Sequence, residues 1–225
     1  MADKNVLDKD HNEEVIAKAK DFWTRYQKSI MIVSVAIILL GGGYYGYKNF
    51  VQKPNEEKAV DAIYKAEEYY RMDSLRLALN GDGLNMGFLK VIDKYGGTDM
   101  GNLAHFYAGD CYLRTGDFTK AVKHLEDFST SSKQIQARAY KLLGDAYSEL
   151  GKNDEAIANY KKAAHQFTED NTNAAEYLFF AASLSEKTGK SKEAIELYKE
   201  IKDKFPGTQQ SNDADKYLAK LGVYN

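Results

Sequence analysis

The sequence predicts an all-α protein, in which an N-terminal transmembrane helix is followed by an α-solenoid of stacked helical hairpins and a C-terminal capping helix. Three observations carry this prediction. An uncharged run of 19 residues lies near the N-terminus, at 29–47. A hairpin pattern with small residues at fixed steps recurs in the second half of the chain. The chain also has 17 tyrosines and only two prolines, which suits a helical, aromatic-rich solenoid.

Residues 1–28 form a charged leader with one apolar face. Glu13 and Glu14 open the predicted helix and lysines follow them, an order that the helix dipole favours. We expect an amphipathic helix that runs directly into the apolar segment and lies in the lipid headgroup layer, or docks on a membrane partner. The apolar residues that recur at helical spacing are Val15, Ala19, Phe22, Trp23, Tyr26 and Ile30.

The uncharged run 29–47 is predicted to be a transmembrane helix. At about 1.5 Å per residue it spans roughly 28 Å, close to the hydrocarbon thickness of a bilayer. Aromatic residues lie at both of its ends, as in interfacial belts. The 28-residue leader exceeds the charged n-region of an ordinary signal peptide, and no small-x-small cleavage site follows the apolar run, so an uncleaved anchor is favoured over a signal peptide. Gly42 and Gly46 would let a second membrane helix approach closely, and we predict them as helix-packing residues.

Basic residues around the span suggest its orientation. Four lie shortly before it and three after it, so the positive-inside rule weakly favours a cytoplasmic N-terminus. The short leader favours the same orientation. In a bacterium the anchor would then lie in the inner membrane, as a single pass, with the C-terminal domain in the periplasm. The residues counted are Lys18, Lys20, Arg25, Lys28, Lys48, Lys53 and Lys58.

A linker is expected over 48–54, followed by one continuous solenoid domain over 55–225. Its first part is predicted to be a degenerate hairpin, 56–95. Apolar residues at helical spacing predict a first helix over 56–72. Asn80-Gly81-Asp82-Gly83 reads as a turn, because the further acids of a calcium loop are missing. A second helix is expected from about 84 to 95.

Three clear repeats follow the degenerate hairpin. The segment 109–121 aligns with 144–156 without a gap at an offset of 35 residues, and 182–194 follows 38 residues later. A period near 34 residues with this pattern of small and aromatic residues is the tetratricopeptide repeat (TPR) signature. The repeats are predicted near 102–135, 137–170 and 175–208, with the capping helix at 211–221.

The repeated small residues are expected to be structural. Gly109, Gly144 and Ala182 should lie where the two helices of a hairpin cross closely, because a larger side chain would force the helices apart. The alanines expected to oppose them are Ala121, Ala156 and Ala194. A second set should form the turns between the helices, where a positive φ is needed. That set is Gly116, Gly151 and Gly189.

Catalysis, a metal site and a cofactor site are not expected. The histidines show no metal-ligand spacing, Cys111 has no cysteine partner, and no phosphate loop or nucleophile elbow is present. Basic and acidic residues nearly balance, at 31 and 33, which argues against nucleic-acid binding. We therefore expect protein partners, and no small-molecule substrate.

A protein-binding groove is expected on the concave face, formed by the first helix of each repeat. Solenoids that grip a chaperone's C-terminal carboxylate use lysine and asparagine there, whereas this chain has Asp110, Asp145 and Ser183 in place of the asparagines. An unused solvated surface is the alternative interpretation. The predicted groove residues are Phe106, Asp110, Leu113, Arg114, Arg138, Lys141, Asp145, Glu149, Glu176, Phe179, Ser183 and Lys187.

The whole plan resembles the YfgM family: a short cytoplasmic leader, one span, then periplasmic TPR-like hairpins. The stretch NGDG…GFLKVIDKYGGTDMGNLAHFYAGDCYL looks like the version in membrane-anchored TPR proteins of the Bacteroidota. The resemblance implies an ancillary subunit of the Sec translocon that works beside a periplasmic chaperone and helps to handle exported polypeptides. Two alternatives stay open: a periplasmic scaffold for envelope or outer-membrane assembly, and a cytoplasm-facing import receptor.

Overall fold

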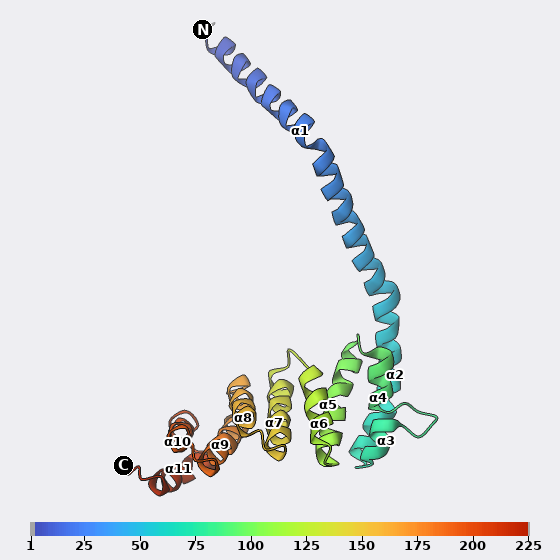
Figure 1. Cartoon of the computed structure of the whole chain (residues 1–225). Helices are drawn as coiled ribbons and strands as arrows, with labels where there is room; N and C mark the ends of the chain where they lie inside the picture. Colours follow the sequence, from blue (N-terminus) through green and yellow to red (C-terminus); the bar gives the residue numbers. More distant parts are fainter. Residues whose placement is uncertain (1–2, 225) are drawn as a thin grey trace. The chain divides into compact units, whose positions relative to one another are not determined.

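The computed structural model describes the backbone of residues 3–224 and the side chains of residues 15–224. Within the described range every element is helical, apart from an isolated antiparallel bridge between Gly81 and Met86. The prediction of an all-α protein is therefore confirmed. The chain divides into two compact units, residues 1–54 and residues 55–225, and Figure 1 shows the elements of each. The side chains of Glu13 and Glu14 lie outside the described residues.

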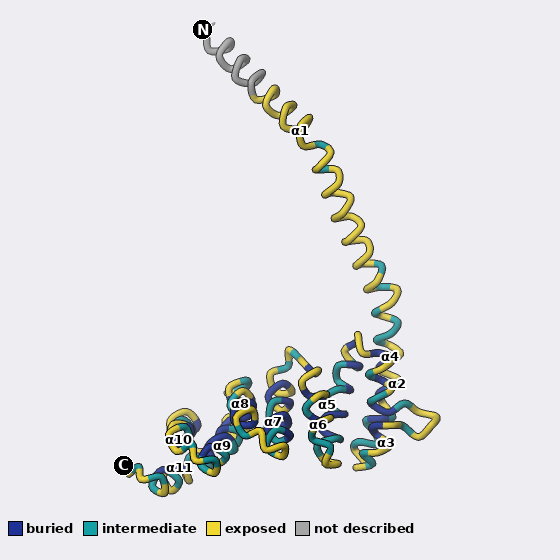
Figure 2. Tube along the Cα trace, viewed as in Figure 1, coloured by how far each residue is buried: buried dark blue, intermediate teal, exposed yellow. Residues whose placement is uncertain are grey.

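The first unit is built from α1, Asp3–Tyr47, which continues into a π-helical segment, η1, Lys48–Gln52. The predicted span 29–47 forms the C-terminal part of α1. Most residues of this segment are exposed (yellow in Figure 2), and they include large apolar ones such as Leu40, which is 75% exposed. By length and composition, the helical run Val15–Arg71 is capable of crossing a membrane, and it is the one such run in the described part of the chain. A Cβ built on Gly42 or Gly46 meets no atom within 4 Å.

The segment expected as a linker, 48–54, is helical throughout. It comprises η1 and the first residues of α2, Lys53–Arg71. Pro54 lies inside this continuous helical run, directly after η1, and its missing N–H removes one backbone hydrogen bond where the helix changes from π to α geometry.

The second unit begins with the degenerate hairpin, in which α2 is followed by α3, Leu75–Asn80, and α4, Phe88–Tyr95. The short helix α3 was not expected, and α4 begins at Phe88 instead of near 84. The reason is local turn chemistry. The Asp82 carboxylate accepts hydrogen bonds from the backbone N–H groups of Leu84 and Asn85, at 2.9 and 2.6 Å, which keeps 82–85 out of a helix.

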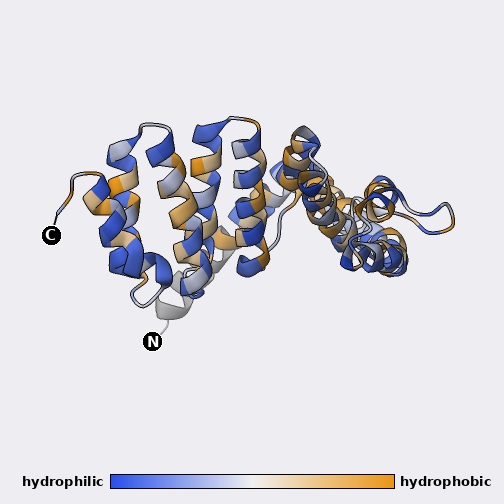
Figure 3. Cartoon of the chain, turned by 90° about the horizontal axis from the view of Figure 1, so that it is seen from below, coloured by the Kyte–Doolittle hydropathy of each residue, from blue (hydrophilic) through white to orange (hydrophobic). Residues whose placement is uncertain are grey.

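Three regular hairpins and a capping helix follow, stacked in chain order (Figure 1). The turn glycines Gly116, Gly151 and Gly189 have φ values of 84°, 71° and 79°, as predicted. Each helix carries both hydrophilic and hydrophobic residues (Figure 3), as expected where a helix packs on neighbours and also meets solvent. The elements are α5 (Asp99–Arg114) and α6 (Phe118–Asp127), α7 (Lys133–Glu149) and α8 (Asn153–Gln166), α9 (Asn171–Lys187) and α10 (Ser191–Lys204), and the cap α11 (Gln209–Lys220).

The helices of a hairpin cross closely at the predicted small residues. A Cβ added to Gly109 would lie 2.5 Å from Cγ of Leu125, and one added to Gly144 would lie 2.5 Å from ring atoms of Tyr160. The closest opposing atoms thus come from Leu125 and Tyr160, one helical turn beyond the alanines that we expected to oppose the glycines. The close approach leaves no room for a side chain on the first helix.

Gly144→Ala should therefore destabilise the solenoid by about 1–3 kcal/mol, the usual cost of forcing extra atoms into a packed site. This loss would exceed the gain of up to about 1 kcal/mol that alanine normally gives in a helix. Chemical denaturation of the purified chain measures the change. In a Tyr160→Leu background the same substitution should cost clearly less, because the opposing ring is gone. An equal cost in both backgrounds would contradict the crossing as the cause.

Candidate functional site

Four predicted groove residues meet in one depression of the solenoid. Leu113 and Arg114, at the end of α5, line it together with Asp145 and Glu149 on α7, and its volume is about 510 Å³. We call it the inner depression. Successive helical residues turn by about 100°, so Asp145 and Glu149 share one face of α7 with two further predicted residues, Arg138 and Lys141.

Most charges in the inner depression already have partners. The Asp145 carboxylate accepts hydrogen bonds from the Tyr160 hydroxyl at 2.9 Å and from the Lys141 ammonium at 2.7 Å. Arg114 forms an ion pair with Asp73. Glu149, by contrast, is exposed and has no ion pair with any described residue. It is therefore the charge in this depression most available to a partner. Burial raises the pKa of Tyr160, so its hydroxyl stays a donor at neutral pH.

Two predicted groove residues prove to be buried, which corrects the expectation that they face outward. Asp110 is 5% exposed because the Tyr70 hydroxyl, from the leading hairpin, donates a hydrogen bond to its carboxylate. Burial and this hydrogen bond raise the pKa of Tyr70 to about 12. Phe106 is 6% exposed and packs against Phe128, with ring centroids 5.3 Å apart. Both side chains join neighbouring helices together.

The remaining groove residues lie outside the inner depression. Arg138 lines a second depression of about 330 Å³ with Tyr177, and its guanidinium lies 5.8 Å from the Phe106 ring centroid. In the third repeat, Glu176 and Phe179 are half-buried, and the Phe179 ring packs against Tyr217 of the capping helix at 5.2 Å. Ser183 and Lys187 are exposed. Binding of a partner by any of these residues stays a prediction.

Three side chains that could take part in chemistry, His105, His124 and Cys111, are partly or fully buried. The Nδ1 atoms of His105 and His124 lie 3.2 Å apart, and the His124 ring stacks on Tyr112. Cys111 is buried, and burial raises the pKa of its thiol to about 12, which disfavours the reactive thiolate. Among the described residues, no group of three His, Cys, Asp or Glu side chains is placed to hold a metal ion. The geometry offers surfaces for binding.

Comparison with known proteins points to the same kind of molecule. Residues 20–140, more than half of the chain, match the family described as "Tetratricopeptide repeat-like domain", and residues 141–208 match "Tetratricopeptide repeat". A solved structure described as "Crystal structure of MamA protein" is similar, with a TM-score of 0.52 and 17% identity. The likeness covers 76% of this chain and 91% of that one, and at this identity it concerns the fold alone. None of the curated proteins matches the chain.

The histidine pair predicts a loss of stability in acid. Burial lowers the pKa of both His105 and His124; Lys123 lowers both further, Lys120 and the neighbouring His105 lower that of His124, and Asp127 raises both. Because the two pKa values are lower in the folded chain, the unfolded chain should bind more protons between about pH 7 and pH 5. The contribution of the pair to the free energy of unfolding is therefore fully present above about pH 6.5, the pKa of histidine in the unfolded chain, and is lost as the pH falls below it. Thermal denaturation of the wild type and of His105→Gln across this range tests the effect. The melting temperature should fall less steeply with acidification in the variant; parallel curves would contradict it.

Proposed function

The chain belongs to the tetratricopeptide repeat-like domain family, and from this premise we propose that it is a non-catalytic scaffold that holds other proteins at a membrane. The TPR fold supports protein–protein interaction. One observation carries the membrane part of the proposal: a single chain joins a helix long and apolar enough to span a bilayer to a solenoid with an open inner depression.

The anchor is proposed to be a single pass through a bacterial inner membrane, with the N-terminus in the cytoplasm and the solenoid in the periplasm. The large apolar residues of α1, which are exposed along the predicted span, support burial in lipid. The excess of basic residues before the span, four against three, supports the orientation.

As its more specific role, we propose an ancillary subunit of the Sec translocon that handles exported polypeptides together with a periplasmic chaperone. The support is the resemblance of the whole plan to the YfgM family. The inner depression also supports binding of a polypeptide. Leu113 offers an apolar contact there, and the same depression contains the Glu149 carboxylate, which has no ion pair with any described residue. An extended segment with mixed apolar and basic residues would fit such a surface.

Co-purification tests the translocon role. The translocon channel should be recovered with the full chain from gently solubilised membranes, and Gly42→Leu with Gly46→Leu should reduce the recovery if the span makes the contact, because leucine would block close helix approach. Ser34→Leu, in the same span outside the glycine pair, serves as the control. Complete absence of the channel from the wild-type preparation would exclude this role.

Protease digestion of intact spheroplasts tests the orientation. A periplasmic solenoid should be degraded from outside, while the leader stays protected. An import receptor would give the reverse pattern, with a surviving solenoid. Lysed spheroplasts provide the control that the folded solenoid is cleavable at all.

A further inference from the structure

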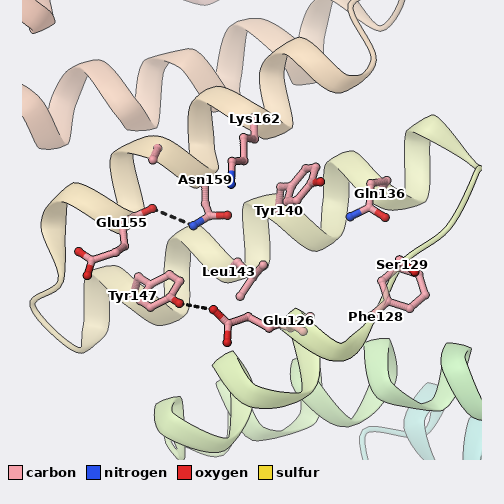
Figure 4. Close-up of a pocket in the computed structure, with 12 residues that line it drawn as sticks. Glu126, Phe128, Ser129, Gln136, Tyr140, Leu143, Tyr147, Glu155, Asn159 and Lys162 are labelled. Carbon is pink, nitrogen blue, oxygen red and sulfur yellow. Dashed lines mark hydrogen bonds between the residues drawn. The ribbon is translucent and has the colours of Figure 1, made fainter. Parts of the chain in front are cut away.

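A further cavity of the solenoid lies on the side of α7 that faces away from the inner depression. It has a volume of about 610 Å³ and is lined by residues of α6, the loop after it, α7 and α8. We call it the outer groove. Figure 4 shows its main polar and aromatic residues: Glu126, Tyr140, Tyr147, Glu155, Asn159 and Lys162. Tyr140 and Tyr147 lie about half a helical turn away from Asp145 around α7, so the two surfaces are separate.

The outer groove exists because α6 is short. It has 10 residues, whereas the equivalent helices α8 and α10 have 14 each. Phe128 turns the chain into an extended conformation, and a run of serine and threonine follows. In the next repeat the corresponding last turn of α8 contains Ala163 and Ala164, which are fully or almost fully buried. Without that turn on α6, Tyr140 of α7 stays partly accessible, with the Lys162 ammonium 5.8 Å from its ring centroid.

The second helices of neighbouring repeats meet at two junctions: α6 with α8 at the outer groove, and α8 with α10 in the next repeat. The charges at the first junction differ from those at the second. Between α8 and α10, Lys161 pairs with Glu193 at 2.9 Å. The repeat offsets of 35 and 38 residues place Glu126 at the position of Lys161, and Glu155 at the position of Glu193. The first junction therefore has two carboxylates where the second has an ion pair. Among the described residues, no ion pair joins α6 to α8.

Both carboxylates act on the same tyrosine. The Tyr147 hydroxyl donates a hydrogen bond to Glu126 at 2.5 Å, and burial, this hydrogen bond and the charges of Glu126 and Glu155 raise its pKa to about 12. Lys152 lies over the Tyr147 ring, 5.6 Å from its centroid, but forms no ion pair with either carboxylate among the described residues. This end of the groove carries excess negative charge.

A largely buried amide adds a polar group to the groove. Asn159 is 8% exposed, and its Nδ2 donates a hydrogen bond to the Glu155 carbonyl at 2.8 Å. Figure 4 shows the amide at the groove, next to Tyr140 and Lys162. At the equivalent position α10 has Leu197, which is buried and apolar. The first junction thus places a polar amide where the second places an apolar core side chain.

We propose that the outer groove binds a polypeptide segment of a partner protein in which an arginine or lysine is flanked by apolar side chains. The basic group would lie between Glu126 and Glu155, in the role that Lys161 has at the next junction. An apolar neighbour would cover Tyr140, and a backbone N–H would donate to Asn159. This surface goes beyond the proposed inner-face function and does not depend on it.

The test uses the full chain in detergent micelles and two labelled synthetic peptides. One has leucines flanking arginines, and its twin has glutamate in place of each arginine. Fluorescence anisotropy should show that the wild type binds the arginine peptide at least about tenfold more tightly than the glutamate twin. Equal binding of the two peptides would overturn the proposal.

Glu126→Lys locates the binding. It should allow an ion pair with Glu155 like that of Lys161 with Glu193, in exchange for the lost hydrogen bond from Tyr147, so that the melting temperature stays close to that of the wild type. Binding of the arginine peptide should weaken at least about tenfold. A near-wild-type melting temperature would exclude misfolding as the cause. Glu196→Lys is the matched control, because it makes the same charge change at an exposed site on α10 and should keep wild-type affinity. Unchanged binding by Glu126→Lys, or equal weakening by both variants, would overturn the proposal. Either failure leaves the anchored-scaffold proposal open, since channel co-purification and protease protection test it separately.

Discussion

The close crossing of the two helices in each hairpin is the contact on which the solenoid depends. Gly109 against Leu125 and Gly144 against Tyr160 bring the helix backbones together, so that the remaining apolar faces can pack on the next hairpin. The crossing also reaches the binding surface. The Tyr160 ring packs on Gly144, and its hydroxyl donates a hydrogen bond to the Asp145 carboxylate at 2.9 Å. This hydrogen bond holds the carboxylate in place at the inner depression. Tyr160 therefore both packs at the helix crossing and holds a charged group at the surface.

Repeated residues predicted the hairpins well, because each repeat solves the same local problem. The turn glycines, the small residues at the crossings and the order of helices were all readable from the sequence. The leading hairpin was harder, since it has no second copy for comparison. There Asp82 binds the backbone of Leu84 and Asn85 and delays α4, and α3 forms in a stretch without a strong helical pattern. Local side-chain to backbone hydrogen bonds of this kind are not visible in hydrophobic periodicity.

Counting positions on the first helices located part of the candidate site. It found Leu113, Arg114, Asp145 and Glu149, which do meet in one depression. It failed for Asp110, because the group that buries it is Tyr70, 40 residues earlier and in a hairpin without a clear repeat signature. It also missed Tyr160, which comes from a second helix. Periodicity within one helix predicts the face on which a residue lies. It does not predict which side chain from another helix packs over that residue.

The outer groove could have been found from the sequence by asking where aligned repeats differ. Identical positions in all copies describe the frame, because every hairpin must close and stack. Glu126 and Lys161 occupy one equivalent position with opposite charges, although Glu155 and Glu193 opposite them are the same residue type. A partly exposed ion pair contributes only about 0–1 kcal/mol, so the fold tolerates either arrangement. Stability therefore does not decide the charge at this position. A partner that contacts the outer groove can decide the charge at this position. The short α6 leaves the groove open at the place where the charge differs between the repeats.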